Sequence, residues 1–336
     1  MVITVLLFIL GLILLIKGGD WFVDGATGIA QRFHIPEILI GATVVSIGTT
    51  LPEVMVSATS ALSGHGEIAY GNAIGSIICN TAFIAALSIT IKPAPVQRYT
   101  LRTPVMFFFL SAAFYMYTAY IDGFFSRVTG IVLLGIFLVY MILTVMQMTR
   151  DPEHPELAPD GTAITNEEEI AEETRTTGKN LFLLVLGAAL IAVGANLLVD
   201  NGILIAQALG VPESVIALTF VALGTSLPEL VTAVTSLLKG HGSMSIGNVI
   251  GANLFNLVLV SGVSTSLAPF KVPESSVIAG HNASLVLEIP VMLAVMLILT
   301  VPAMFKGKLY RGQGILLLCI YAAFCIFQFT MPRLPI

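Results

Sequence analysis

The sequence has little charge and no basic run. Only 10% of its 336 residues are Asp, Glu, Lys or Arg, and 56% are hydrophobic, whereas soluble globular domains carry about 25% charged residues. This composition excludes a soluble enzyme, and the lack of clustered Lys and Arg excludes a nucleic-acid partner. Apolar stretches of membrane-spanning length recur along the chain, so we expect a polytopic protein within a lipid bilayer.

Cysteine is also scarce. Cys79, Cys319 and Cys325 lie in apolar segments without paired spacing, which excludes a disulfide framework and a zinc site. We interpret them as packing residues. The first residues lack the basic region and the small-residue cleavage site of a signal peptide, so we expect them to form a retained first helix.

Apolar segments bounded by charge, proline or glycine predict ten transmembrane helices. Each segment is long enough to cross a hydrocarbon core of roughly 30 Å. Helices are expected because an isolated strand would leave its backbone polar groups unpaired in lipid. The predicted fold is therefore an all-α integral membrane protein. The expected spans are residues 2–19, 38–62, 68–91, 104–120, 127–149, 179–199, 213–238, 244–267, 285–305 and 312–331.

Basic residues predict the orientation, because short cytoplasmic loops are enriched in Lys and Arg. If both termini lie outside, twelve basic residues fall at cytoplasmic loops and helix ends, and only Arg127, Lys271 and Arg333 fall outside. Both termini are therefore expected outside. The twelve are Lys17, Arg32, Lys92, Arg98, Arg102, Arg150, Arg175, Lys179, Lys239, Lys306, Lys308 and Arg311.

An internal repeat relates the two halves of the chain. Residues 24–80 align without gaps on residues 200–256, at an offset of 176 and with 25 identities in 57 positions. Glycine and polar positions carry the match, which indicates gene duplication rather than shared apolar composition. Because each half holds five predicted helices, the second half enters the membrane in the opposite direction. Such inverted repeats are typical of transporters that bind their substrate near the membrane midplane.

An acidic segment, residues 150–178, separates the repeats and is expected to be a mobile cytoplasmic linker. The predicted organisation is a first five-helix repeat at residues 1–149, this loop, and a second five-helix repeat at residues 179–336. The nine acidic residues of the loop are Asp151, Glu153, Glu156, Asp160, Glu167, Glu168, Glu169, Glu172 and Glu173.

The strongest chemical signal is a motif that occurs once in each repeat. It reads Gly-Thr-Thr-Leu-Pro-Glu at residues 48–53 and Gly-Thr-Ser-Leu-Pro-Glu at residues 224–229. Each proline lacks an N–H group and clashes with the carbonyl four residues earlier, so nearby carbonyl oxygens need another partner in the membrane. Hydroxyl and carboxylate oxygens follow within one turn. The candidate ligands of this motif are Thr49, Thr50, Glu53, Thr225, Ser226 and Glu229.

Oxygen-only ligand sets select hard cations, and Ca²⁺ takes six to eight oxygens. Glu53 and Glu229 together balance the charge of one divalent ion. Without an ion, two close carboxylates repel each other, so we expect sodium ions or protons to occupy the site on the return step. A single intramembrane glutamate can be a neutral residue in a kinked helix, but two at matched positions favour ion binding.

A second paired motif reads Gly-Asn-x-x-Gly at residues 71–75 and 247–251, and an asparagine follows each at Asn80 and Asn256. Glycines four residues apart allow helices to pack closely. The two asparagines either offer their amide oxygens to the ions, orient the glutamates or only pack, and the sequence leaves these alternatives open. The repeated pairs His65/His241 and Asp24/Asp200 are interpreted as turn residues on opposite faces and as helix-end or gating contacts, respectively.

These paired motifs resemble the two alpha repeats of the cation/calcium exchanger superfamily, and the chain is similar to prokaryotic sodium/calcium antiporters over nearly its whole length. The resemblance implies a secondary active antiporter that exchanges Ca²⁺ for Na⁺ by alternating access in a prokaryotic plasma (inner) membrane. It also implies that the protein is not an enzyme, needs no cofactor and works as a monomer. The first and sixth helices would be the pair that slides across the other eight.

The resemblance also implies a set of ligands. Glu53 and Glu229, with main-chain oxygens of Thr49 and Thr225, would bind calcium. The other positions would form flanking sodium sites, made by Ser46, Thr50 and Ser76 on one side and by Ala222, Ser226 and the position of Ala252 on the other. Asn80 would match the asparagine of the first repeat.

Two positions depart from the antiporter pattern. Asn256 stands where well-studied members carry aspartate, and Ala252 stands where they carry serine. The first change loses a third carboxylate, and the second loses a hydroxyl of one sodium site. We therefore hypothesise that two sodium ions, or partly protons, are exchanged per calcium.

Two alternatives remain open. One is proton/calcium or broader cation exchange, which differs by not requiring sodium. The other is a channel or an ion sensor without coupled exchange. The two glutamates argue against a channel, because no ring of identical subunits is needed to build the site. No nucleophile–base pair of a hydrolytic enzyme is present.

Overall fold

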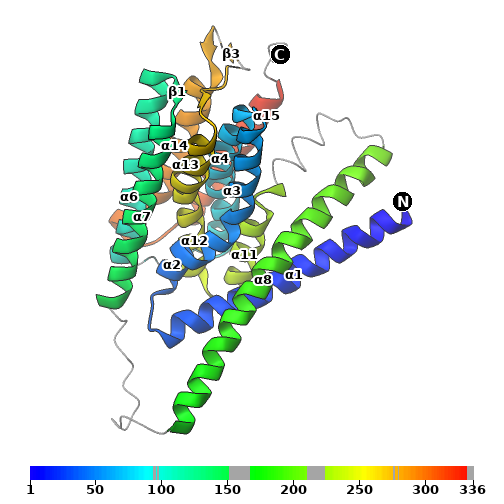
Figure 1. Cartoon of the computed structure of the whole chain (residues 1–336), viewed down its shortest axis with the longest axis vertical. Helices are drawn as coiled ribbons and strands as arrows, with labels where there is room; N and C mark the ends of the chain where they lie inside the picture. Colours follow the sequence, from blue (N-terminus) through cyan, green and yellow to red (C-terminus); the bar gives the residue numbers. More distant parts are fainter. Residues whose placement is uncertain are drawn as a thin grey trace.

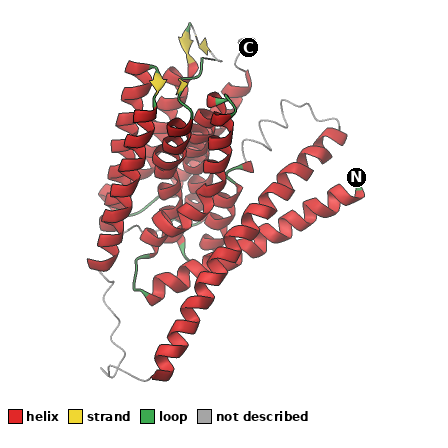
Figure 2. Cartoon of the chain, viewed as in Figure 1, coloured by secondary structure: helices red, strands yellow, loops and turns green. Residues whose placement is uncertain are grey.

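The computed structural model describes residues 1–93, 96, 98–150, 167–209, 224–274, 277–278 and 280–330. Within this part of the chain, nine helices or continuous helical runs are long and apolar enough to cross a membrane, and the shorter helix α11 is also apolar. Figures 1 and 2 show that the molecule is almost entirely helical. The first half of the predicted seventh span lies outside the described residues, so the expected number of ten is not confirmed.

The first repeat contains five helical runs. In chain order its elements are α1 (Val2–Arg32), α2 (Glu37–Ile40), the π-helix η1 (Gly41–Val45), α3 (Ser46–Leu62), α4 (Gly66–Cys79), η2 (Asn80–Ala85), α5 (Ala86–Ile91), α6 (Arg98–Tyr117), η3 (Thr118–Asp122) and α7 (Arg127–Arg150).

The second repeat follows the same order where it is described. Its elements are α8 (Glu167–Ala208), α11 (Leu227–Leu238), α12 (Gly242–Phe255), η5 (Asn256–Val260), α13 (Ser261–Leu267), η6 (Ser284–Glu288), α14 (Ile289–Lys306) and α15 (Arg311–Thr330).

The fold is mostly helical but not purely so, because four two-residue strands are present in addition to the predicted helices. Strand β1 (Phe124–Phe125) pairs antiparallel with β2 (Phe270–Lys271), and β3 (Val277–Ile278) pairs antiparallel with β4 (His281–Asn282). They lie in the loops at one end of the bundle (Figure 2). Backbone groups that leave a helix end still need partners, and these short ladders supply them.

The first and sixth spans are longer than the sequence predicts. The apolar pattern suggests an end near residue 19, but α1 continues to Arg32, and α8 begins at Glu167 inside the segment expected to be a linker. With 31 residues, α1 is about 46 Å long, which exceeds the roughly 30 Å hydrocarbon core. Its oblique course explains the excess length (Figure 1). Lys17 and Asp24 therefore lie within this helix rather than at its end.

Helices α1 and α8 pack against each other as an antiparallel pair through glycines. A Cβ on Gly18 would lie 3.0 Å from the carbonyl oxygen of Gly187, and a Cβ on Gly11 would lie 2.9 Å from that of Gly194. Glycines let helix backbones approach this closely. Gly11 and Gly187 are separated by the repeat offset, as are Gly18 and Gly194, so the crossing follows the symmetry of the repeat.

The remaining helices form a compact bundle, and α12 with its continuation lies at its centre. The helical run at residues 242–267 is 89% buried over its apolar window, whereas α15 is 11% buried. Gly247 of α12 lies directly against the Ile38 carbonyl of α2, with no room for a side chain. This backbone contact brings the second motif of one repeat next to the first motif of the other.

The glycine crossing yields a prediction for stability. Gly18→Leu places a side chain 2.8 Å from the Ile191 backbone nitrogen, so we expect it to separate α1 from α8 and to lower the free energy of unfolding by about 1–3 kcal/mol. Thermal unfolding of the purified protein in detergent measures this. Gly135→Leu is the control, because among the described residues nothing lies within 4 Å of a Cβ there. Equal melting temperatures for the two variants would contradict the predicted role of the crossing.

Candidate ion-binding site

The two motif glutamates come together in the middle of the bundle. Glu53 lies on α3 and Glu229 in the first turn of α11, and neither has exposed surface. Their carboxyl groups are near enough to interact electrostatically, and Glu229 lies beside the hydroxyls of Thr49 and Thr50. The motifs, which are far apart in the sequence, thus form one cluster.

In the first repeat the helix runs through the motif without a break. Pro52 lies inside α3, and the π-helix η1 ends directly before Ser46. Two side chains donate hydrogen bonds to carbonyl groups of the π-helix. Ser46 donates to the Gly41 carbonyl at 2.7 Å, and Tyr140 donates to the Ala42 carbonyl at 2.9 Å. A π-helix frequently marks a functional site within a longer helix.

In the second repeat the same motif interrupts the helix. Ser226 is the N-cap of α11, and Pro228 stands in its first turn. Proline is favoured there because the first N–H groups of a helix have no intrahelical acceptor. The sequence predicts the same kink in both repeats, but the structure has a continuous helix at Pro52 and a helix start at Pro228.

The two asparagines also occupy equivalent structural positions. Asn80 is the first residue of η2, and Asn256 is the first residue of η5. Each π-helix changes the backbone hydrogen-bond pattern one turn after the Gly-Asn motif, on the helices that pack against α3 and α11. Both side chains have no exposed surface.

Six buried side chains in the cluster share one feature: each lacks a hydrogen-bond partner for its polar side-chain atoms among the described residues. They form three repeat-related pairs, Thr50/Ser226, Glu53/Glu229 and Asn80/Asn256, and all are 0–2% exposed. A buried polar group without a partner costs about 1–3 kcal/mol, and a charged group costs more. Oxygen atoms gathered in this way fit a dehydrated cation.

The remaining predicted ligands differ in how deeply they are buried and in whether their side chains are already hydrogen-bonded. Thr49 and Ser76 are buried, at 1% and 4% exposed, and Thr225 is partly exposed at the helix break. Ser46 is fully buried, but its hydroxyl is already bonded. Ala222 lies outside the described residues.

Sequence reasoning did not assign a role to Asn248, which the structure places between the repeats. Its side-chain oxygen accepts hydrogen bonds from Ser46 and Thr49, both at 3.3 Å, and its amide nitrogen donates to the Thr232 hydroxyl at 2.9 Å. Thr232 in turn donates to the carbonyls of Pro228 and Glu229. Asn248 therefore connects the two glutamate motifs.

Among the described residues, its repeat partner Asn72 forms its side-chain hydrogen bonds within the first repeat. Its amide donates to the Ser57 hydroxyl at 2.8 Å and to the Glu53 carbonyl at 3.3 Å. Both asparagines are part of the repeated Gly-Asn motif, so the repetition itself was the signal that could have identified them.

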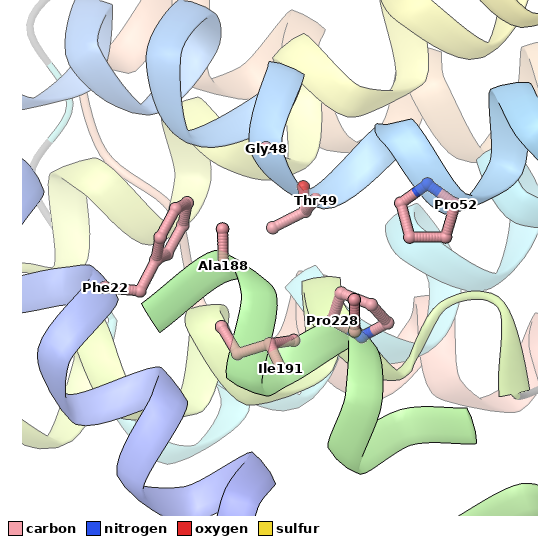
Figure 3. Close-up of a pocket in the computed structure, with 8 residues that line it drawn as sticks. Phe22, Gly48, Thr49, Pro52, Ala188, Ile191 and Pro228 are labelled. Atoms are coloured by element: carbon pink, nitrogen blue, oxygen red, sulfur yellow. The ribbon is translucent and has the colours of Figure 1, made fainter. Parts of the chain in front are cut away.

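A small pocket lies between the α1–α8 pair and the two motifs. Figure 3 shows Phe22 of α1 and Ala188 and Ile191 of α8 facing Thr49 and the two motif prolines. The pocket is lined by residues of the motifs of both repeats and by the α1–α8 pair, so this pair packs directly beside the two motifs.

The two repeated histidines are turn residues, as predicted. His65 and His241 are the N-caps of α4 and α12, and each follows a glycine with positive φ, at Gly64 and Gly240. A glycine tolerates this left-handed conformation without strain.

Comparison with known proteins agrees with the geometry. The family model described as sodium/calcium exchanger protein matches residues 3–146 and 179–330. The chain is 30% identical to the sodium/calcium exchanger MaX1 of Methanosarcina acetivorans over 96% of this chain and 98% of that protein. It is 36% identical to an uncharacterized membrane protein of Methanocaldococcus jannaschii over 94% of each.

Solved structures agree as well. The sodium-calcium exchanger NCX_Mj, in crystals soaked with 2.5 mM Na⁺ and 10 mM Sr²⁺, matches with a TM-score of 0.79 and 33% identity, covering 98% of this chain and 99% of that one. The same exchanger soaked with 10 mM Na⁺ and no Ca²⁺ matches with a TM-score of 0.76. On the family model and these full-length relatives together, the chain is a member of the sodium/calcium exchanger protein family.

Proposed function

We propose that the protein is a secondary active antiporter that exchanges Ca²⁺ for Na⁺ across a prokaryotic plasma membrane by alternating access. One observation carries the proposal: three repeat-related pairs of buried side chains, on α3, at the start of α11 and on the π-helices packed against them, have no partners for their oxygens among the described residues. Family membership supports the identity of the ions. The inverted repeat supports the mechanism, because such transporters expose a central site to each side in turn.

Each ligand has a role in this proposal. Glu53 and Glu229, with the main-chain oxygens of Thr49 and Thr225, bind Ca²⁺ and neutralise its charge. Thr50 and Ser76 contribute to a sodium site on one flank, and Ser46 lines it. Ser226 and Ala222 border the opposite flank. Asn80 and Asn256 supply amide oxygens between the two carboxylates.

Charge balance at the site favours electroneutral exchange. The six buried side chains without hydrogen-bond partners among the described residues include two carboxylates, because Asn256 and Asn80 are neutral. Two Na⁺ or one Ca²⁺ balance these carboxylates, whereas a third Na⁺ would leave an uncompensated positive charge in a region of low dielectric constant. Ala252 also has no hydroxyl to bind an additional ion. The proposed stoichiometry is therefore two sodium ions per calcium.

Proton coupling is a second candidate, supported by the same substitutions. A carboxylate pair can carry protons instead of sodium on the return step, because two close carboxylates repel each other without a cation. A proton-coupled protein would take up Ca²⁺ in response to a pH gradient in the absence of Na⁺.

The first test is calcium-45 uptake into proteoliposomes loaded with Na⁺, with choline-loaded vesicles at matched pH for comparison. We expect uptake only with internal Na⁺. We also expect Glu53→Gln and Glu229→Gln each to lower calcium affinity by roughly 100-fold or more, because loss of one partner of a buried charge pair costs about 3–5 kcal/mol. The control is Glu67→Gln, an exposed glutamate in the first turn of α4.

Two outcomes of this assay would contradict the proposal. Uptake that is independent of Na⁺ but driven by a pH gradient would assign the protein to proton-coupled exchange. Calcium flux without any counter-ion gradient requirement would indicate a channel.

The second test measures voltage dependence. With potassium gradients and valinomycin setting the membrane potential, we expect the wild-type exchange rate to be equal at either polarity. Asn256→Asp adds a third buried carboxylate, so we expect this variant to bind an additional cation and to become voltage-dependent, more so when combined with Ala252→Ser. Strong voltage dependence of the wild type would refute two-for-one exchange.

A further inference from the structure

The two repeats are packed unequally against the α1–α8 pair. At one face α1 covers α11: a Cβ on Gly19 would lie 2.6 Å from a Val231 methyl and 3.0 Å from the Thr235 hydroxyl. The repeat partners of these α11 residues lie on α3, and they are uncovered. Met55 is 63% exposed, and Thr59 is also exposed. We call the surface of α11 that α1 covers the closed face, and the exposed surface of α3 the open face.

An ion pair fixes α1 at the closed face. Lys239, directly after α11, donates hydrogen bonds to the Asp24 carboxylate at 2.7 Å and to the Asp20 carbonyl at 3.0 Å, both on α1. The Asp20 carboxylate is 3.6 Å from the same ammonium group. Lys239 thus joins the end of the second motif helix to the helix that covers it.

The same turn is also fixed to the bundle. Nδ1 of His241, two residues after Lys239, lies 2.7 Å from the Glu37 carboxylate at the start of α2. The turn is anchored to the bundle by His241 and reaches α1 through Lys239. A movement of α1 away from α11 would therefore break the Lys239 contacts and leave the His241 contact intact.

The internal repeat provides no equivalent contact at the open face. Asp200 on α8 is the repeat partner of Asp24, but Ser63 stands at the position that corresponds to Lys239. A serine hydroxyl cannot form an ion pair with Asp200. Of the two acidic partners of Lys239, Asp24 is repeated as Asp200, whereas Asn196 stands at the repeat position of Asp20, and the lysine is present once.

We propose that Lys239 is a one-sided latch, whose ion pair with Asp24 favours the conformation in which α1 closes the ion site at the face of α11. This inference rests on the proposed function, because alternating access is the motion that opens the contact. In an inverted-repeat transporter the two repeats exchange their environments between conformations. The opposite conformation loses the Lys239 pair and gains no ion pair at Ser63, so this contact shifts the population toward the conformation that is closed at α11.

The experiment measures exposure of the two repeat-related threonines. Thr235→Cys and Thr59→Cys are made separately in a full-length cysteine-free background, and their rates of modification by a polar maleimide are measured in detergent. Lys239→Ser is expected to raise the rate at Thr235→Cys by roughly two- to fivefold, the range that an exposed ion pair can contribute, and to lower the rate at Thr59→Cys.

Further variants distinguish a change of the whole transporter's conformation from a local loosening of α1 near Lys239. Ser63→Lys builds a latch at the open face, so it should also raise the rate at Thr235→Cys, although it lies at the other end of the bundle. The exchanged pair Asp24→Lys with Lys239→Asp should restore the wild-type rates. Lys271→Ser, which removes an exposed lysine elsewhere, should change neither rate.

An unchanged rate at Thr235→Cys in Lys239→Ser would overturn the latch, and so would a change that Ser63→Lys fails to reproduce. Sodium-driven calcium uptake is measured for the same variants in proteoliposomes. If Lys239→Ser leaves the labelling rates unaltered and sodium-driven uptake is normal, the latch is refuted and the proposed function stands. If the labelling rates change as expected but the protein shows no sodium-driven uptake, the proposed sodium coupling is refuted and the latch stands.

Discussion

Buried oxygen atoms without hydrogen-bond partners among the described residues are the constraint on which this structure depends. Glu53 and Glu229 are fully buried, and their carboxylates, with neighbouring hydroxyls and amides, lack hydrogen bonds from the described residues. Such an arrangement is expensive unless a cation supplies the missing interactions. The glycine contact between α12 and α2 and the π-helices at both asparagines bring these oxygens together.

Symmetry of the sequence is not matched by symmetry of the structure. The same Leu-Pro-Glu sequence lies inside a continuous helix in the first repeat and at a helix start in the second. α1 covers α11, whereas the matching surface of α3 is exposed. Two equivalent halves held in unequal environments are what an alternating transporter requires, because exchange of the two environments moves access from one face to the other.

Much of the site was predictable from the sequence, because its chemistry is local and duplicated. A glutamate beside a proline in an apolar segment is expensive and unusual, and its recurrence at a constant offset identified Glu53 and Glu229. The role of Asn248 was not predictable. Its partners Ser46 and Thr49 lie 202 and 199 residues away, and no spacing within the motif indicates that it contacts the other repeat.

The sequence by itself determined the membrane class, the duplication, the types of candidate ligand and the number of carboxylates they include, since these follow from composition and short-range pattern. Only the tertiary structure decided how far α1 and α8 extend, which motif breaks its helix and which face is closed. These features depend on packing between distant segments. The apolar pattern near residue 19 suggests a helix end, but the oblique packing of α1 against α8 allows the helix to continue to Arg32.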